Sequence, residues 1–370
     1  MSDRPEVKIG VNVLGIGCHG GAWRTGEVDP RAGADIGYYQ HVARIAERGT
    51  LDAIFLADSP GLQGLPLGRP PMTMIEPTVI LTAVAAVTER IGVVATVSTT
   101  FNHPYNIARR ISSLDHASRG RAGINAVTTY NPAAVANFGS EGILDHEQRY
   151  GRAGEFLDVV KELWDSWDED AIVADVAAAR WADPDRIHAI GHHGAHFDVA
   201  GPLNLPRSPQ GRPVVVQAGG SEQGRALAGR HAEAVFTSQL TLPDGQAYYA
   251  DLKRRAASHG RDPDTIKILP GLTTVIGGTE AEARARYERL EELAGGVSSL
   301  PQLALTLGLD AGELDLDGPL PQAKLADRAT HNGSHGFYDS FVGATLRDHL
   351  GLPRPASRFD NRVLDRTGAA

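Results

Sequence analysis

The 370-residue chain contains a single cysteine, Cys18, so no disulfide can form within it. A chain without disulfides suits a reducing compartment, and we expect it in the cytoplasm. Aromatic residues make up only 6% of the sequence, but the apolar fraction of 42% and the charged fraction of 22% are ordinary for a globular protein. This composition excludes a chain that is disordered throughout.

Positive charge and long apolar runs are also scarce. Lysine and arginine number 36 against 45 aspartates and glutamates, which gives a formal net charge of −9 with histidine neutral. A mildly acidic chain lacks the basic surface that binds nucleic acid or anionic membranes. The sequence has no stretch of about 20 apolar residues, as a membrane-spanning helix requires, and no signal-peptide pattern at its start. We therefore expect neither nucleic acid nor membrane as a partner.

Most of the sequence consists of short apolar runs, each followed by a helical pattern. The expected strands cover residues 8–16, 53–57, 91–98, 122–128, 214–218, 234–238 and 267–272, the last extended by 273–276. The expected helices cover residues 35–48 (ending at a C′ glycine, Gly49), 76–90, 106–117, 145–167, 243–258 and 280–294, with a further helix after the turn at 219–221. Because the strands read as continuous apolar runs, they are typical of parallel strands covered on both faces. Repeated strand–helix units favour a wound parallel sheet or a barrel.

Two stretches interrupt this pattern. Residues 169–213, after the fourth unit, are rich in Asp, His, Gly and Pro, and HAIGHHGAHFDVAG (188–201) within them suggests a small hairpin. An insertion of this length is usually functional, for example as a cover over a site. After residue 295 only GFYDSF (336–341) is a candidate for an eighth strand, and it is weak. We expect residues 296–370 to be irregular.

Ligands of parallel α/β folds sit at the carboxyl ends of the strands, so the residues that follow each strand are the candidates for chemistry. The strongest signal is AGGSEQGR (218–225), in which a strand ends in Gly-Gly-Ser and turns directly into a helix. Free N–H groups at that helix start, the Ser221 hydroxyl and the close backbone approach that Gly220 permits make an anion site suited to phosphate. The spacing excludes the GxGxxG and Walker motifs. We favour phosphate binding over a plain tight turn.

Hydroxyls and a carboxylate follow three earlier strands. Asp58 directly follows an apolar strand and must find hydrogen-bond donors, either in a ligand or in the turn that it would cap with Ser59. Thr96 and Thr100 share a face at period two, where they bond either each other or a polar ring system. The fourth strand offers Asn125 and Thr128, which leave the same two alternatives open.

Histidines mark three further places. His146 and Tyr150 lie four residues apart at a helix start, where they either hold a phosphate or form a surface capping pattern. His19, after the first strand, contacts substrate or flavin in one interpretation and solvent in the other. The three histidines within 192–196 have no helical i, i+4 pair and no nearby cysteine, so we favour a solvated loop and predict no metal.

Five long segments together carry a resemblance to a known family. They are AERGTLDAIFLADS (46–59), AAVTERIGVVATVSTTFNHPYNIARRISSLDHASRGRAGINAVTT (85–129), DHEQRYGRAGEFLDVVKELWDSW (145–167), GPLNLPRSPQGRPVVVQAGGSEQGRALAGRHAEAVF (201–236) and LRDHLGLPRP (346–355). They resemble bacterial-luciferase-like, flavin-dependent monooxygenases of the nitrilotriacetate, dibenzothiophene-sulfone and long-chain alkane monooxygenase branch. The resemblance covers residues 8–320 and 336–358.

This resemblance implies one TIM (β/α)8-type barrel domain over residues 1–370. It implies a two-component monooxygenase that takes reduced FMN (FMNH2) from a separate flavin reductase and oxygenates a small organic substrate with O2. We expect a homodimer or homotetramer. The alternatives are a deazaflavin-dependent oxidoreductase of the same superfamily and a non-catalytic flavin-binding protein.

The resemblance also assigns roles to residues at matching positions. His19 matches a position near the reacting centre. The remaining positions match flavin contacts. Asp58 matches a position that contacts the flavin, Thr96 or Thr100 lines the isoalloxazine ring, and Val127 and Thr128 lie near that ring. The ribityl-phosphate end faces His146 and Tyr150, and the phosphate turn matches Gly220 and Ser221.

One departure concerns the last strand. Similar proteins carry a helix-rich stretch with the eighth strand between the segments that match 315–321 and 346–355, and here LADRATHNGSHGFYDSF bridges the two. The eighth strand is therefore missing or altered. Because an open barrel exposes two strand edges, either another element or a partner subunit closes it, or the chain is an abridged version of a longer one.

Overall fold

A computed structural model describes residues 7–62, 70–71, 74–129, 131–139, 145–239 and 241–294, together with Ala304, Leu309, Gly312 and Leu314. The chain forms two compact units. The first comprises Met1–Cys18, Val28–Gln63 and Pro70–Thr273, and the second comprises His19–Glu27, Gly64–Arg69 and Thr274–Ala370.

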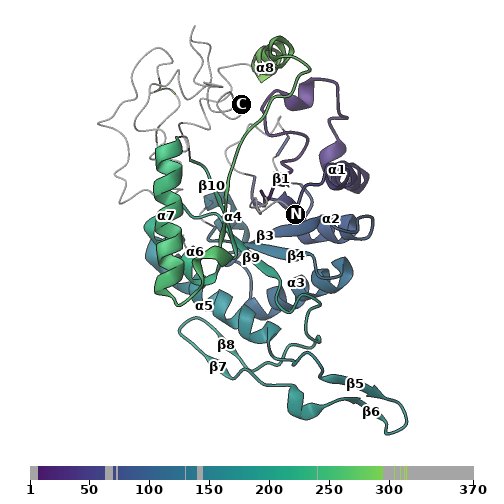
Figure 1. Cartoon of the computed structure of the whole chain (residues 1–370). Helices are drawn as coiled ribbons and strands as arrows, with labels where there is room; N and C mark the ends of the chain where they lie inside the picture. Colours follow the sequence, from purple (N-terminus) through teal and green to yellow (C-terminus); the bar gives the residue numbers. More distant parts are fainter. Residues whose placement is uncertain are drawn as a thin grey trace, which may run out of the picture. The chain divides into compact units, whose positions relative to one another are not determined.

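A parallel sheet of seven strands is the frame of the first unit (Figure 1). The strands are β1 (Gly10–Asn12), β2 (Ala53–Leu56), β3 (Gly92–Ser98), β4 (Ala122–Val127), β9 (Val214–Gln217), β10 (Ala234–Thr237) and β11 (Lys267–Pro270). Each pairs in parallel with the next of these strands along the chain, which is the order of a barrel wall. The predicted wound parallel sheet is confirmed. Within the described residues β1 and β11 are its edges, and the eighth-strand candidate at 336–341 lies outside them.

Helices connect these strands and cover the sheet. They are α1 (Ile36–Arg48), α2 (Pro77–Ala85), α3 (Pro104–Ser118), the short α4 (Pro132–Asn137), α5 (His146–Trp164), α6 (Glu222–His231) and α7 (Leu242–Ser258). Along β3, Val93, Ala95 and Val97 belong to the main apolar core with α1, α2, α3 and α5. The alternate residues, including Thr96, therefore face the opposite side of the sheet. A second core joins α6 and α7 to β10.

The predicted helix over 76–90 is too long, because α2 ends at Ala85. The carboxylate of Glu47, from α1, accepts hydrogen bonds from three consecutive N–H groups at 89–91, at 2.9, 2.6 and 3.0 Å. Because these N–H groups already bond Glu47, they cannot bond the carbonyl groups of a continuing helix.

At the other end of the sheet, β11 ends at Pro270, and the predicted extension over 273–276 is not a strand.

The end of α1 also differs from its prediction in one detail. The helix ends at Arg48 as expected, but the glycine that follows it, Gly49, has an ordinary φ of −75°. The left-handed conformation falls on Thr50, whose φ is 61°. An exposed β-branched residue thus occupies a conformation that favours glycine.

The insertion after α5 contains two antiparallel hairpins, β5 (Ile172–Asp175) with β6 (Arg180–Ala182) and β7 (His192–His193) with β8 (Asp198–Val199). The second confirms the hairpin predicted within 188–201. Of its histidines, His193 and His196 are exposed, as predicted for a solvated loop, whereas His192 is largely buried. Glu155 of α5 accepts hydrogen bonds from the N–H groups of His196 and Phe197 and pairs with the His192 ring, and these contacts lower the pKa of Glu155 although burial raises it.

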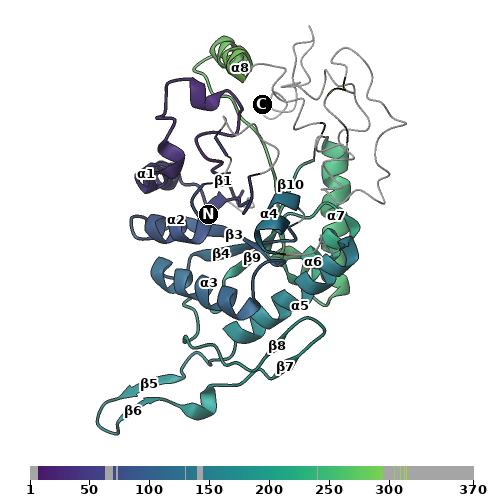
Figure 2. The same cartoon turned by 180° about the vertical axis from the view of Figure 1, so that it is seen from behind.

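The insertion packs at more than one level of the sheet, so its expected role as a cover over the site stays a prediction. Its residues Ser208 and Gln210 bond Asp115 near the end of α3, and Gln210 also donates at 2.8 Å to the carbonyl of Ala122, the first residue of β4, so this part lies at the amino edge. In the β7–β8 hairpin, the Phe197 ring instead lies 5.8 Å from that of His103, the N-cap residue of α3 after β3. Figures 1 and 2, which view the structure from opposite sides, both show β7–β8 beside α5.

The second unit contains α8 (Glu280–Ala294) and the loop 19–27 with a single 3₁₀ turn (Ala22–Arg24). In the part of the chain that the structure describes, no helix combines the length and apolar character needed to cross a membrane.

Candidate functional site

The carboxyl edge of the sheet gathers most of the predicted site residues. Asp58 follows β2, Thr100 follows β3, Thr128 follows β4 and Ser221 follows β9. Because β2, β3, β4 and β9 are neighbours in one parallel sheet, these residues share one edge of the first unit.

The turn after β9 starts α6 as the sequence predicts. Ser221 is the N-cap residue, and its Oγ accepts the N–H of Gly224 at 3.1 Å. The N–H groups of the following two residues have no partner within the helix. The Ser221 hydroxyl still has its own hydrogen to donate, because a hydroxyl is donor and acceptor at once. This helix start therefore offers several donors to an anion.

Gly219, in the same turn, is held from three sides. Its N–H donates to Oε1 of Gln217 at 2.5 Å, and its carbonyl accepts the hydroxyl of Tyr248 at 2.9 Å. A Cβ at this position would lie 2.6 Å from the Cα of Gly224, so the turn packs directly against the first turn of α6. Only glycine fits this contact, so the turn and the start of α6 pack without a side chain between them.

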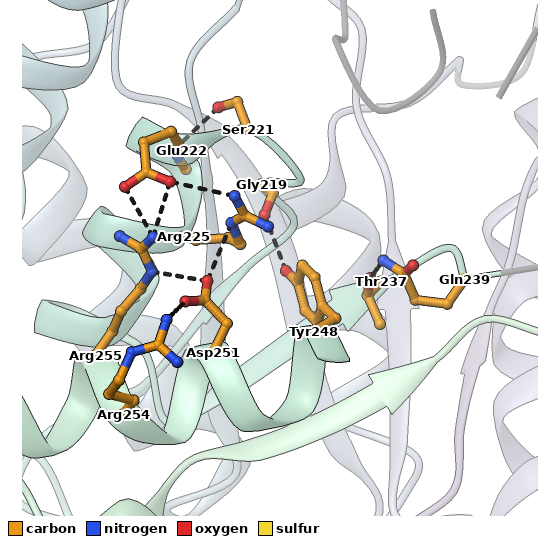
Figure 3. A network of polar contacts seen from close by, with 11 residues as sticks. Gly219, Ser221, Glu222, Arg225, Thr237, Gln239, Tyr248, Asp251, Arg254 and Arg255 are labelled. Carbon is orange, nitrogen blue, oxygen red and sulfur yellow. Dashed lines mark hydrogen bonds and ion pairs between the residues drawn. The ribbon is translucent and has the colours of Figure 1, made fainter. Parts of the chain in front are cut away.

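A charge network joins α6 to α7 behind this turn (Figure 3). Glu222 pairs with Arg225 and Arg255, at 3.2 and 2.8 Å. Asp251 pairs with the same two arginines, at 3.2 and 2.8 Å, and with Arg254. The network links the start of α6 to α7, which also pack together in the second core.

Thr96 and Asn125 form a buried polar pair on the face of the sheet opposite the main core. The two residues are register partners on β3 and β4, each about 3% exposed, and Asn125 Nδ2 donates to Thr96 Oγ1 at 2.9 Å. Among the described residues, none supplies a hydrogen bond to Asn125 Oδ1. A buried amide atom without a partner costs free energy, so this position is suited to a ligand that completes the bond.

Thr100 does not belong to that face. Since β3 ends at Ser98, the period-two alternation from Thr96 does not reach Thr100, which lies in the following turn and is half-buried. Val127 closes β4, and its carbonyl accepts the N–H of Thr99 at 2.9 Å. Thr128 follows it, also half-buried.

Asp58 is a half-buried carboxyl at the end of β2. Its pKa is raised from 3.8 to about 6, first by burial and then by the negative charge of Glu76, while the N–H of Ser59 opposes both. A carboxyl with this pKa changes protonation near neutral pH, which is unusual for aspartate and typical of functional sites.

His146 and Tyr150 lie on the first two turns of α5, with ring centroids 4.8 Å apart. The predicted N-cap, Asp145, is confirmed, since its Oδ1 accepts the N–H of Gln148 at 2.7 Å. Tyr150 acts electrostatically on Tyr248, whose hydroxyl bonds Gly219. The start of α5 and the turn after β9 are thus neighbours, as a shared phosphate-end site requires.

His19 belongs to the second unit, whereas the residues described above belong to the first. Its Nε2 pairs with Glu291 of α8 at 2.9 Å, and its Nδ1 accepts the N–H of Gly21 at 3.1 Å. Both ring nitrogens are therefore engaged within the second unit. Its predicted place near a reacting centre stays a prediction.

Sequence reasoning missed three residues that support the turn after β9. Gln217 and Thr237 end their strands, and Tyr248 lies on α7, each no more than 6% exposed. The spacing of 248, 252 and 256 along α7 places Tyr248 on a buried stripe, which a helical-periodicity test would have found. Its partner could not be inferred, because Gly219 is remote in sequence.

Within the described ranges, no group of three His, Cys, Asp or Glu side chains is arranged to hold a metal ion.

Comparison with known proteins agrees with this geometry. The family profile described as luciferase-like monooxygenase matches residues 18–339. Nitrilotriacetate monooxygenase component A of Aminobacter aminovorans is 44% identical over 362 residues, covering 95% of this chain and 79% of the relative. The relative is therefore the longer protein.

Two solved structures share the fold. Long-chain alkane monooxygenase superposes with a TM-score of 0.79 at 33% identity, covering 86% of this chain and 76% of the other. Riboflavin lyase, solved with modified FMN and its substrate riboflavin, superposes with a TM-score of 0.81 at 32% identity, covering 93% and 77%.

Proposed function

The chain belongs to the luciferase-like monooxygenase family, and from this membership we propose that it is a two-component FMN-dependent monooxygenase. It takes reduced FMN from a separate flavin reductase and uses O2 to oxygenate a small organic substrate. The relative named component A supports the two-component arrangement, and the riboflavin lyase structure with modified FMN supports the cofactor.

The observation that carries this proposal is the coincidence of two incomplete sites on one sheet. The α6 start presents hydrogen-bond donors with no acceptor within the helix, and Asn125 presents a buried amide atom with no partner among the described residues. A phosphate completes the first and a polar ring the second. FMN carries both groups, so the residues present fit this cofactor.

The chain's own residues then divide the work of binding. Ser221 and the Gly220 backbone hold the phosphate, while His146 and Tyr150 flank the ribityl-phosphate end. The polar edge of the ring contacts Asn125, Thr96 and Thr128. Asp58 lies beside it with a carboxyl group that gains or loses its proton near pH 6.

Bound reduced FMN supplies the electrons that activate O2, and the protein supplies orientation and exclusion of water. In this proposal Val127 and Thr100 lie near the ring at the carboxyl edge of the sheet, and His19 keeps the role near the reacting centre that the resemblance assigns to it. The protein acts in the cytoplasm, consistent with its single cysteine, and assembles as a homodimer or homotetramer.

Flavin-coupled O2 uptake tests the proposal. Purified protein is mixed with reduced FMN and a panel of nitrilotriacetate, long-chain alkanes, sulfones, amines and riboflavin, and oxygenated product is detected by mass spectrometry with ¹⁸O2. We expect ¹⁸O in one product, formed only when reduced FMN is present.

The alternatives give different results. A deazaflavin-dependent oxidoreductase reduces its cofactor under anaerobic conditions and incorporates no ¹⁸O. A non-catalytic flavin-binding protein binds FMN without turning over any substrate. Protein that neither binds FMN nor delays the autoxidation of reduced FMN would contradict the proposal outright.

A further inference from the structure

Tyr248 connects the helix α7 to the turn after β9 through one buried hydroxyl. Its side chain is 5% exposed and packs in the second core with Val235 and Leu252. Its hydroxyl donates to the carbonyl of Gly219 at 2.9 Å (Figure 3). Burial raises the pKa of Tyr248 to about 12, so the hydroxyl keeps its proton at physiological pH.

The direction of this hydrogen bond follows from the carbonyl, which can only accept, so the Tyr248 hydroxyl donates its hydrogen to Gly219. The Thr237 hydroxyl, which accepts Gln239 Nε2 at 2.9 Å, lies close to the same Tyr248 oxygen.

Fixing the Gly219 carbonyl also fixes the next N–H group. The Gly219–Gly220 peptide is trans, so its C=O and N–H point in opposite directions. With the carbonyl of Gly219 directed to α7, the N–H of Gly220 points away from α7. No described residue accepts a hydrogen bond from this N–H, so it is available to a ligand.

Glycines make this constraint necessary. Two successive glycines have broad backbone freedom, and an unrestrained Gly219–Gly220 peptide would rotate between orientations. A turn that must bind an anion gains affinity when its N–H groups are oriented beforehand.

We propose that Tyr248 is a positioning residue for the flavin phosphate: by holding the Gly219 carbonyl it aims the Gly220 N–H at the phosphate beside Ser221. This inference rests on the proposed function, because it takes the anion to be the phosphate of FMN. It predicts that Tyr248 contributes to phosphate recognition without touching the ligand.

The test compares two flavins on three proteins. Kd values for FMN, by fluorescence quenching, and for riboflavin, by displacement of bound FMN, are measured for the unchanged protein, Tyr248→Phe and Tyr249→Phe. Tyr249 is the matched control, since it is 50% exposed on the same helix and contacts Lys253 through its ring. Tyr248→Phe removes one hydroxyl and keeps the ring in the core.

We expect Tyr248→Phe to weaken FMN binding about threefold to tenfold, the effect of one hydrogen bond, and to leave riboflavin binding unchanged. Tyr249→Phe should change neither. Thr237→Val, which removes a hydroxyl that lies close to that of Tyr248, should produce a smaller loss for FMN alone and serves as the second variant if Tyr248→Phe folds poorly.

Equal losses for FMN and riboflavin would show a general structural role and overturn the inference, as would an unchanged FMN affinity. If the unchanged protein binds FMN while these variants behave in either way, the proposed function survives and only the role of Tyr248 fails. If the unchanged protein binds no flavin, the proposed function fails and this inference with it.

Discussion

The Ser221 hydroxyl serves the helix and, in the proposed function, the ligand. Substituting aspartate separates the two roles, because aspartate is as good an N-cap residue as serine but carries a negative charge. We expect Ser221→Asp to keep α6 intact and to weaken FMN binding by about tenfold or more, since its carboxylate meets the phosphate. Fluorescence titration measures the affinity, and circular dichroism checks the fold.

Asparagine at the same position is the neutral control. Ser221→Asn also caps the helix and should retain most of the FMN affinity. Undiminished FMN binding by Ser221→Asp would show that the phosphate lies elsewhere.

The raised pKa of Asp58 predicts how the free energy of unfolding depends on pH. Because its pKa is raised from 3.8 to about 6 in the folded chain, the protonated carboxyl favours folding, and this stabilisation is present below pH 3.8 and lost as the pH rises through 6. We expect Asp58→Asn to remove this loss, so that at pH 8 its free energy of unfolding exceeds that of the unchanged protein by about 1–2 kcal/mol. This difference is smaller than the shift of the pKa alone would give, because the side chain is partly solvated.

Urea unfolding between pH 4 and pH 8 measures the difference. Glu76→Gln should move the transition to lower pH, because Glu76 is the charge that raises the pKa of Asp58. Parallel stability curves for the unchanged protein and Asp58→Asn would contradict the raised pKa.

At the end of helix α1, the left-handed conformation of Thr50 is a local cost that glycine removes. A β-branched residue at φ 61° is strained, whereas glycine is not, although glycine adds entropy to the unfolded chain. We expect Thr50→Gly to raise the free energy of unfolding by about 0.5–1 kcal/mol, measured by chemical denaturation.

Gly49→Ala is the matched comparison for this helix end. Since the φ of Gly49 is −75°, alanine fits there, and stability should change little. A large loss from Gly49→Ala, without a gain from Thr50→Gly, would contradict the observed helix end.

The β7–β8 hairpin depends on one carboxylate of α5. Glu155 is 14% exposed and accepts two backbone N–H groups and the His192 ring, so Glu155→Ala leaves these donors without their partner. We expect limited proteolysis to cut residues 188–201 several-fold faster in this variant. FMN affinity should stay unchanged, because Glu155 and this hairpin are not among the residues proposed to bind the cofactor.

Glu162→Ala provides the control, because Glu162 is 44% exposed and pairs with the same histidine alone. Equal protease sensitivity in both variants would contradict the central role of Glu155.

For the molecule as a whole, the proposed site draws on β2, β3, β4, β9 and the starts of α5 and α6, so ligand binding should stabilise the whole first unit. FMN at about 100 times its Kd adds about 2.7 kcal/mol to the folded state. We expect a rise of a few degrees in Tm by differential scanning calorimetry, absent in Ser221→Asp. An equal rise in that variant would show that FMN stabilises the protein from another site.

Several elements could be predicted because their signals are local. Apolar runs identified the seven parallel strands, and Gly-Gly-Ser before a helix identified the turn after β9. The end of α2 and the position of the insertion could not be predicted, because Glu47 and Asp115 act on N–H groups and side chains remote in sequence. Neither segment by itself has a sequence pattern that indicates such a contact.

The amino-acid pattern alone was sufficient for the seven parallel strands and the turn from β9 into α6, because periodicity, turn residues and helix capping act over a few neighbouring positions. The family followed from the resemblance of five long segments. Only the folded chain shows that Asn125 keeps an unpaired amide oxygen among the described residues, that burial raises the pKa of Asp58, and that Tyr248 holds Gly219. Each of these depends on which distant groups exclude water from a side chain or bond it. That arrangement is decided by packing in three dimensions.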